Sequence, residues 1–240
     1  MTNIKIEIRD LYKVFGNNPE AAMKHVHAGI SKQDLLDHHG HVLGLRDINV
    51  KIKSKRIQVI MGLSGSGKST LIRHINRLIE PTEGEVIVDG DNVLAMSTEE
   101  LRDFRRHKAS MVFQRFGLLP HRTVSQNVAY GLSIQGISEG EAFERSQRWI
   151  DRVGLAGFEQ HFPAQLSGGM QQRVGLARAL ATDAEILLMD EAFSALDPLI
   201  RTDMQNILLD LQEELHKTIV FITHDLDEAL RIGDEISILR

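Results

Sequence analysis

The sequence has 240 residues, of which 42% are hydrophobic and 25% charged, as is ordinary for a globular protein with a sizeable core. Its formal net charge of -5 gives no support for nucleic-acid binding, and the lack of cysteine excludes disulfides and thiolate metal sites. No apolar run approaches the roughly 18 residues that span a bilayer, and residues 1–5 do not resemble a signal peptide. We therefore expect a cytosolic protein, which could still dock on a membrane protein.

The predicted elements alternate between strands and helices along the chain. Short apolar or alternating runs predict strands at residues 4–8, 48–52, 57–61, 85–88, 110–113, 185–190, 218–223 and 235–239. Helical patterns begin at Pro19 and at Ser97, where Glu100 completes a capping box, and cover residues 71–79, 138–154 and 173–181. This order predicts an α/β protein with a largely parallel sheet covered by helices.

Residues 62–70, Gly-Leu-Ser-Gly-Ser-Gly-Lys-Ser-Thr, fit the phosphate-binding loop pattern, and a strand and a helix flank them as the pattern requires. Glycines let backbone N–H groups turn toward a phosphate, and the helix N-terminus adds partial positive charge. A chance Gly/Ser-rich loop is the weaker alternative in this context. Lys68 is expected to reach the β- and γ-phosphates and Ser69 to ligate Mg²⁺. The expected nucleotide contacts here are Gly62, Ser64, Gly65, Ser66, Gly67, Lys68, Ser69 and Thr70.

A second signal lies at Asp190 and Glu191, which follow the apolar strand predicted at residues 185–190. The carboxyl end of a central strand is where an α/β sheet binds its ligands. We expect Asp190 to hold Mg²⁺ and Glu191 to polarise the water that attacks the γ-phosphate. An acidic cap on the next turn is the alternative, which the nearby phosphate loop disfavours.

A third signal is the sequence Ser167-Gly168-Gly169, which precedes a predicted helix. A hydroxyl and two glycines at a helix N-terminus make a second candidate anion site, although Ser-Gly-Gly alone is a common turn. One nucleotide does not need two such loops from one chain. A two-fold dimer resolves this, because the loop of one subunit then faces the phosphates held by the other.

Taken together, these motifs resemble ABC transporter ATPases over almost the whole chain. The phosphate loop, Gln114, residues 166–172, residues 186–191, residues 194–197 and His224 occur in the order typical of that family. The resemblance implies a P-loop NTPase fold: an ABC ATPase core with a mixed sheet and a helical subdomain at about residues 115–180. We expect residues 1–240 to form a single such domain.

The resemblance also assigns roles to four residues that carry little signal alone. It implies that Gln114 contacts Mg²⁺ and senses the transmembrane partner, and that Asp197 lies in a loop crossing the dimer interface. It implies that His224 contacts the γ-phosphate and that Phe15 stacks on adenine, with Tyr12 as a rival. Considered singly, these residues have plainer alternatives: a strand-end amide, a turn acid, a structural histidine and a core aromatic, and for His224 alone the structural role is favoured.

An insertion at about residues 17–41 resembles the ATPases of quaternary-amine importers, which take up glycine betaine, proline betaine or choline. The resemblance implies an ATPase that uses ATP and Mg²⁺, with Glu191, His224 and Lys68 as catalytic residues. It implies a peripheral protein at the cytoplasmic face of the cell membrane. Its expected partners are permease subunits, a substrate-binding protein indirectly and an ATP-dependent second copy, with no nucleic acid. Closure would reach the permease through residues 116–120.

The sequence departs from that family in two places. Lys55-Arg56 stands where the family has Gly-Glu, so the turn before the phosphate-loop strand lacks its permissive glycine. The sequence also stops at Arg240, where the family continues, so we expect no C-terminal regulatory domain within these residues. Five histidines of the insertion have no diagnostic metal-site spacing, which favours a solvated surface: His25, His27, His38, His39 and His41.

Two alternatives stay open at this stage. The first is an importer ATPase for another solute, such as methionine or a polyamine. The second is a non-transport ABC protein that acts on nucleic acid. The acidic net charge and the presence of one cassette disfavour the second alternative.

Overall fold

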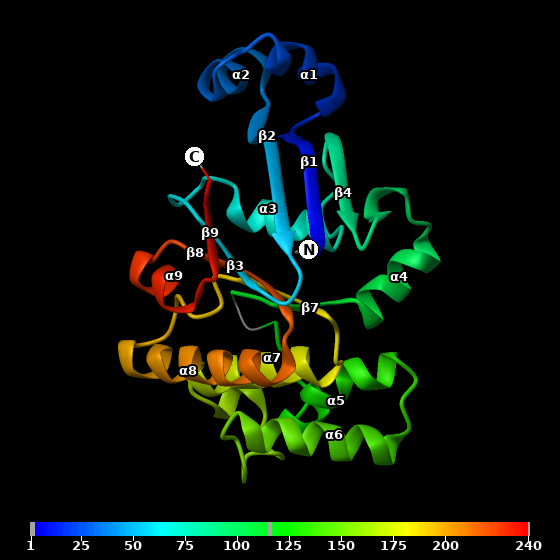
Figure 1. Ribbon diagram of the computed structural model, residues 1–240, viewed down its shortest axis with the longest axis vertical. Helices are drawn as coiled ribbons and strands as arrows, with labels where there is room; N and C mark the ends of the chain where they lie inside the picture. The colour runs from blue at the N-terminus through cyan, green and yellow to red at the C-terminus, as the bar shows by residue number, and fades with distance from the viewer. Residues whose placement is uncertain (1–2, 115–116, 240) are drawn as a thin grey trace. The chain divides into compact units, whose positions relative to one another are not determined.

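The computed structural model describes residues 3–114 and 117–239. Two sheets organise the chain (Figure 1), and the chain divides into two compact units. The antiparallel unit comprises Met1–Ser54, Gly62–Leu101 and Ile238–Arg240. The parallel unit comprises Lys55–Met61 and Arg102–Ser237. The single domain with a helical subdomain stays a prediction, since these units follow different boundaries.

The antiparallel unit is built on a sheet in the order β2-β1-β4-β5. Its strands are β1 (Ile4–Phe15), β2 (Val42–Lys53), β4 (Glu83–Val88) and β5 (Asp91–Asn92). β1 pairs antiparallel with both β2 and β4, so it lies between them (Figure 1). Both β1 and β2 extend beyond the short alternating runs that predicted them. The helix α3 (Lys68–Ile75) and the short η1 (Val93–Ala95) also belong to this unit.

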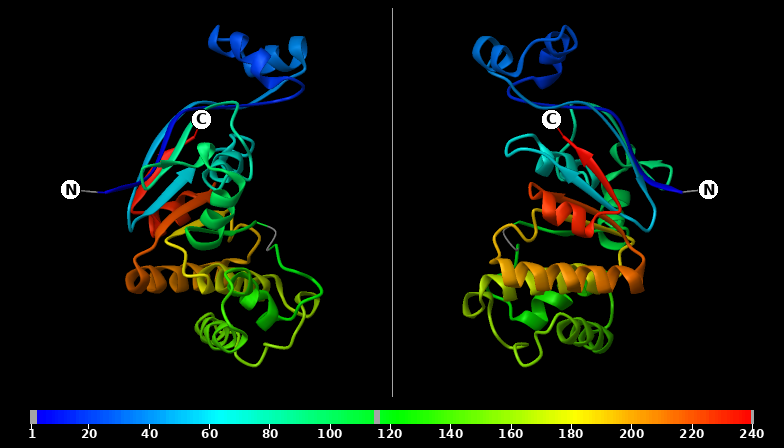
Figure 2. Two further views of the ribbon diagram at one scale, coloured as in Figure 1. Left: turned by 90° about the vertical axis from the view of Figure 1, so that its right-hand side faces the viewer. Right: turned by 60° about the vertical axis from the view of Figure 1, so that its left-hand side comes forward.

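The insertion forms two helices between β1 and β2. The first, α1 (Pro19–His27), begins at the predicted proline, whereas the second, α2 (Lys32–His39), was not predicted. A small apolar core joins both helices to the strands: Val14, Ala22, Met23, Val26, Leu35 and Leu43. Both helices lie beyond the ends of the two long strands (Figure 2). This packing holds the insertion in a defined position against its sheet.

The parallel unit contains a sheet in the order β6-β7-β8-β3-β9. Its strands are β3 (Ile57–Met61), β6 (Ala109–Val112), β7 (Ile186–Asp190), β8 (Thr218–Thr223) and β9 (Glu235–Ile238). The pairs β6–β7, β7–β8 and β3–β8 are parallel, and every residue of β7 and β8 is buried. Near-continuous apolar strands are typical of a parallel sheet covered on both faces. The prediction of a strand at residues 218–223 is confirmed.

Helices fill the rest of the chain. They are α4 (Thr98–His107), α5 (Val124–Ile134), α6 (Glu139–Arg152), η2 (Pro163–Gln165), α7 (Gly168–Ala181), α8 (Pro198–Leu215) and α9 (Leu226–Ile232). The helix predicted at residues 138–154 is confirmed as α6, and Trp149 and Ile150 are buried on it. Across the described residues, no helix combines the length and apolarity that crossing a bilayer requires.

Local backbone chemistry explains where several elements begin and end. The predicted capping box of α4 is confirmed, because Ser97 N donates to Glu100 Oε2 at 2.7 Å and Glu100 N to Ser97 Oγ at 3.3 Å. α3 ends at Ile75 rather than at residue 79, since Arg77 takes a left-handed φ of 51° that no α-helix continues. Lys55 adopts φ 60° in the turn before β3, so a non-glycine residue holds a backbone conformation that favours glycine.

Candidate nucleotide-binding site

The phosphate loop leads from the buried strand β3 into α3, as predicted. Lys68 is only 4% exposed, and its ammonium donates to the carbonyl oxygens of Gly62 at 2.9 Å and Leu63 at 3.0 Å. Gly67, the residue that caps α3, has φ 97°, and a Cβ there would lie 2.7 Å from the carbonyl oxygen of Gly44. Only glycine fits this position, so the loop approaches β2 backbone to backbone. The result is a tight turn that presents the first N–H groups of α3.

A buried histidine supports the loop from within α3. The ring of His74 is fully buried, and its Nδ1 lies 2.6 Å from the carbonyl oxygen of Thr70. Burial lowers the pKa of His74 from 6.5 to about 4. The imidazole is therefore neutral at physiological pH, because a charged ring would lose its hydration in this interior.

Of the two aromatic candidates for stacking on adenine, Phe15 is the accessible one. Phe15 is 39% exposed at the end of β1, and the Lys13 ammonium lies 5.0 Å from its ring centroid. Tyr12 instead packs against the apolar core of the insertion and meets His27 edge to face at 5.2 Å between ring centroids. Burial raises the pKa of the Tyr12 hydroxyl. This geometry favours Phe15 over Tyr12 as the stacking residue, and that role stays a prediction.

The second group of predicted residues meets at the carboxyl ends of β6, β7 and β8. Asp190 is fully buried at the end of β7, and Glu191 follows with a side chain that is 16% exposed. Gln114 donates from Nε2 to Glu191 Oε2 at 3.0 Å. His224, just after β8, places Nδ1 3.8 Å from Glu191 Oε1. A carboxylate held between an amide donor and an imidazole is suited to orienting a water and accepting its proton.

The backbone of Glu191 is unusual, because it adopts a left-handed φ of 45°. Its N–H donates to the carbonyl oxygen of Ile222 at 3.2 Å, and Ser194 Oγ donates to its carbonyl oxygen at 2.9 Å. Such a conformation costs a non-glycine residue about 1–3 kcal/mol and is held by its surroundings. The left-handed conformation turns the chain directly after Asp190, at the end of β7.

The Ser167 loop forms a second helix N-terminus. Ser167 caps α7 and accepts from Met170 N at 3.3 Å, while Gly168 is exposed in the first turn. Gly169 packs so closely against α8 that a Cβ would lie 2.6 Å from Ile200 Cγ2. Asp197 caps α8 by accepting from Ile200 N at 3.1 Å. The predicted dimer-interface residues Ser167 and Asp197 thus begin two helices that pack together in the parallel unit.

Strand register explains why these motifs converge. Met61, the residue before the phosphate loop, pairs with Thr223, the residue before His224. Asp190 pairs with Ile222 on the other side of β8. Parallel strands carry their carboxyl ends to the same edge of a sheet, where α/β proteins bind ligands. Three motifs that lie far apart in the sequence therefore leave the sheet from neighbouring strands.

The structure adds a contact that the sequence analysis missed. Arg178 on α7 donates from Nη1 to the carbonyl oxygen of Gly117 at 2.7 Å, so it ties the Ser167 helix to the segment after Gln114. Phe116, the first residue of the predicted coupling region, lies outside the described residues. An arginine in an otherwise apolar stretch of α7 was the available signal. In the insertion, His25 and His39 stack at 4.0 Å, and the described part of the chain holds no metal-binding group of three His, Cys, Asp or Glu residues.

Comparison with known proteins places this geometry in context. The family model described as ABC transporter matches residues 45–194. The chain belongs to the ABC transporter family. Its fold is that of an ABC ATPase: a bacterial ABC transporter cassette solved as a dimer is 34% identical with a TM-score of 0.83, over 98% of this chain and 94% of that one. The same cassette, solved in a post-hydrolysis state bound to ADP and Pi, matches equally well.

Three curated relatives are named as ATP-binding proteins of transport or import systems. The glycine betaine/proline betaine transport protein ProV of Escherichia coli is 54% identical over 99% of this chain and 59% of its own length. The trimethylamine N-oxide transport protein TmoW of Ruegeria pomeroyi is 50% identical over 98% and 69%, respectively. The methionine import protein MetN of Staphylococcus haemolyticus is 48% identical over 82% and 58%. The chain spans about three fifths of the length of the betaine relatives.

Proposed function

We propose that this protein is the ATP-hydrolysing subunit of an importer for a quaternary-amine osmolyte of the glycine betaine type. The membership of the ABC transporter family supports nucleotide-driven transport, and the cluster of Gln114, Glu191 and His224 supports hydrolysis. The observation that carries the proposal is this cluster, at the edge of the sheet where the strand before the phosphate loop also ends.

The residues present fit the proposed Mg²⁺-nucleotide. Asp190 and Ser69 supply hard oxygen ligands and Gln114 an amide oxygen, which is the donor set that Mg²⁺ prefers. When bound, Mg²⁺ would neutralise charge on the β- and γ-phosphates. Lys68 would add a second positive charge, and Glu191 would orient the attacking water while His224 contacts the γ-phosphate. These roles of the metal and the site residues are part of the proposal.

The choice of solute rests on how much of the chain each relative matches. The relatives named for betaine or trimethylamine N-oxide transport match 98% or more of the chain, whereas the methionine importer relative matches 82%. A fully methylated amine is common to betaine and trimethylamine N-oxide. We therefore place a methylated-amine solute ahead of methionine, with trimethylamine N-oxide as the second candidate within that class.

The proposed assembly is a dimer on permease subunits at the cytoplasmic face of the membrane. Each Ser167 loop would face the phosphates held by the other copy, as the two helix N-termini that glycines precede or begin suggest. A substrate-binding protein would take part only through the permease. Nucleic acid is not among the proposed partners, in keeping with the net charge of -5.

Hydrolysis is tested by ATP turnover of Glu191→Gln, with Glu185→Gln as the matched control on the segment leading into β7. We expect turnover to fall at least about 100-fold in the first variant, because a positioned base contributes 10²–10⁴-fold, and to be unchanged in the second. Parental turnover in Glu191→Gln would reject the proposed chemistry. The solute is tested by uptake of labelled glycine betaine, trimethylamine N-oxide and methionine into vesicles holding the full transporter. Uptake of methionine alone would reject the proposed solute class.

A further inference from the structure

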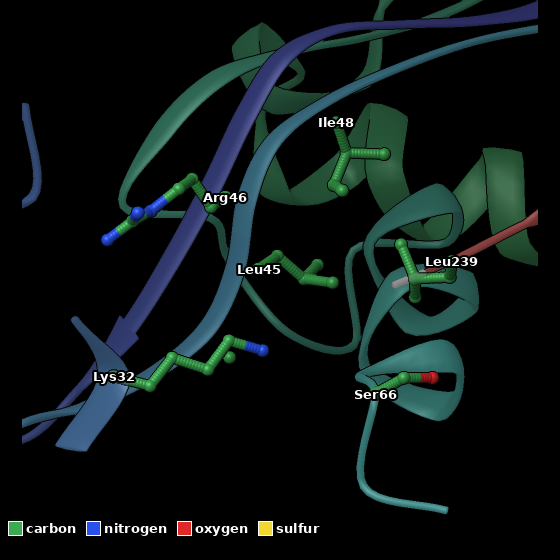
Figure 3. Close-up of a pocket in the computed structure, with 7 residues that line it drawn as sticks. Lys32, Leu45, Arg46, Ile48, Ser66 and Leu239 are labelled. Carbon is green, nitrogen blue, oxygen red and sulfur yellow. The ribbon is translucent and has the colours of Figure 1, made fainter. Parts of the chain in front are cut away.

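A pocket of about 190 Å³ lies on the flank of the phosphate loop, entirely within the antiparallel unit (Figure 3). The β2 residues Gly44, Leu45 and Ile48 line it, together with Ser66 of the loop. The insertion contributes Lys32, whose side chain runs into the pocket toward the side that Ser66 forms. A second cation of the lining, Arg46, points its guanidinium away from the pocket.

The insertion holds Lys32 in this position through several contacts. The apolar core joins α1 and α2 to β1 and β2, with Leu35 fully buried one turn after Lys32. Arg46 donates to the carbonyl oxygen of Ile30, which fixes the turn that leads into α2. Ser31 caps that helix by accepting from Asp34 N at 3.0 Å. Lys32 therefore leaves a fixed helix end rather than a loose surface loop.

The charge at this position has no local explanation. Lys32 is the first residue of α2, where the partial positive charge of a helix N-terminus disfavours a cation. Lys32 is exposed, and within residues 3–114 and 117–239 it takes part in no ion pair. An anionic ligand in the pocket would give Lys32 an ion-pair partner, and this would offset the unfavourable position of a cation at a helix N-terminus.

The surroundings indicate which anion. The ring of Phe15 lies against Gly44, since a Cβ on Gly44 would be 2.8 Å from that ring. The carbonyl oxygen of Gly44 in turn lies against Gly67 of the phosphate loop. The backbone of Gly44 thus lies between Phe15, the residue expected to stack on adenine, and the phosphate loop. A nucleotide that contacts both Phe15 and the phosphate loop must pass Gly44. Gly44 also lines the pocket that Lys32 enters.

We infer that Lys32 is a nucleotide-binding residue supplied by the insertion, which contacts the phosphate chain in addition to Lys68. This inference rests on the proposed function, because it presupposes that the phosphate loop holds an adenine nucleotide. It gives the insertion a role in the affinity for nucleotide. It also means that nucleotide stabilises the packing of α1 and α2 on the sheet, since a ligand stabilises the state that binds it.

The test is calorimetric titration of the full chain with MgATP and MgADP. Lys32→Gln keeps the aliphatic stem and removes the charge, and Lys24→Gln is the matched control on exposed α1, outside the pocket. We expect Lys32→Gln to bind both nucleotides about five- to tenfold more weakly, as for loss of one partly exposed charged contact. Lys24→Gln should bind like the parent, and Lys32→Arg should restore most of the affinity. The difference in nucleotide affinity between the parent and Lys32→Gln should become smaller in high salt, because salt screens the charge of an exposed lysine.

Parental affinity in Lys32→Gln, or equal losses in both glutamine variants, would overturn the inference while the proposed function stands. A parent that binds neither nucleotide would overturn the proposed function and the inference together. Thermal unfolding without nucleotide completes the design. The midpoint of Lys32→Gln should equal or exceed that of the parent, because the substitution removes a cation from a helix N-terminus. A lower midpoint would assign Lys32 a structural role and overturn the inference.

Discussion

Two helices of this protein begin with glycines suited to phosphate, yet their N-termini are built differently. The N-terminus of α3 carries its own buried lysine, held by two loop carbonyls, and Gly67 fits where no Cβ could. The N-terminus of α7 is exposed, is capped by Ser167 and has no lysine in its first turn. The first combines the lysine and the N–H groups expected of a phosphate site, whereas the second supplies only N–H groups and a hydroxyl. This difference is what we expect if, as proposed, α7 acts on a phosphate that the loop of another copy already holds.

The N-terminus of α3, rather than that of α7, should account for most of the binding of MgATP. Lys68→Ala should weaken MgATP binding about 100-fold or more, because it removes charged hydrogen bonds worth about 1.5–3 kcal/mol each. Lys55→Ala removes a lysine that precedes β3 and is not a predicted phosphate contact, and this variant should bind MgATP like the parent. Equilibrium titration of both variants checks this. Affinity in Lys68→Ala within threefold of the parent would show that α3 is not the primary phosphate site.

Gly168→Asp tests the α7 side of the comparison. An acid in the first turn of a helix stabilises it slightly, so folding and monomer binding of MgATP should be preserved. ATP turnover should fall about 100-fold, because the new carboxylate would repel the γ-phosphate brought by the second copy. Gly140→Asp makes the same change in the exposed first turn of α6 and should leave turnover unchanged. Normal turnover in Gly168→Asp would argue that the Ser167 loop never meets a phosphate.

The buried His74 of α3 should make the unfolding free energy of the protein depend on pH in the acid range. The pKa of His74 is lowered from 6.5 to about 4, so the native state disfavours the protonated ring. The contribution of the neutral His74 ring to the unfolding free energy is therefore fully present above pH 6.5 and is lost as the pH falls toward 4. Below pH 4 this contribution causes no further loss. By pH 4.5 this histidine alone should remove about 2–3 kcal/mol of unfolding free energy.

The measurement is urea unfolding of the parent and of His74→Gln at pH 7 and 4.5. Between pH 7 and 4.5, the unfolding free energy of His74→Gln should fall by about 2–3 kcal/mol less than that of the parent. The control His38→Gln, which changes an exposed residue of α2, should lose as much unfolding free energy as the parent. Equal acid losses in the parent and in His74→Gln would exclude the buried ring as the cause.

The smallest effect concerns the turn before β3. Lys55 holds φ 60°, so Lys55→Gly should stabilise the protein by about 0.5–1 kcal/mol through relief of backbone strain. Lys55→Ala keeps the Cβ and should bring no gain. The two variants are compared by thermal unfolding. A gain in both would point to the lysine side chain rather than to its backbone.

Sequence reasoning succeeded where chemistry is local. The six-residue apolar run at Thr218–Thr223 and the Ser97–Glu100 capping box need only near neighbours, and both are confirmed. The site motifs were also readable, since each combines fixed residue types with a strand or a helix start. These local signals located Asp190, Glu191 and Ser167 on the elements that carry them.

Features that depend on distant parts of the chain were not readable. β1 pairs with β2 and β4 across long sequence separations, so its full length depends on partners that a local pattern does not show. The strain at Glu191 is imposed by contacts with Ile222 and Ser194. Lys32 gains its significance only because it lines the same pocket as Ser66 of the phosphate loop, and nothing in the residues around it in the sequence indicates a pocket.

The central claim, that the Ser167 loop completes a site on a second copy, is tested most directly by molecular mass. Light scattering of Glu191→Gln, which should bind ATP without hydrolysing it, is measured with and without saturating MgATP. The account predicts a monomer without nucleotide and a dimer with it. A mass that stays monomeric while ATP is bound would contradict the claim that the two helix N-termini meet across a dimer.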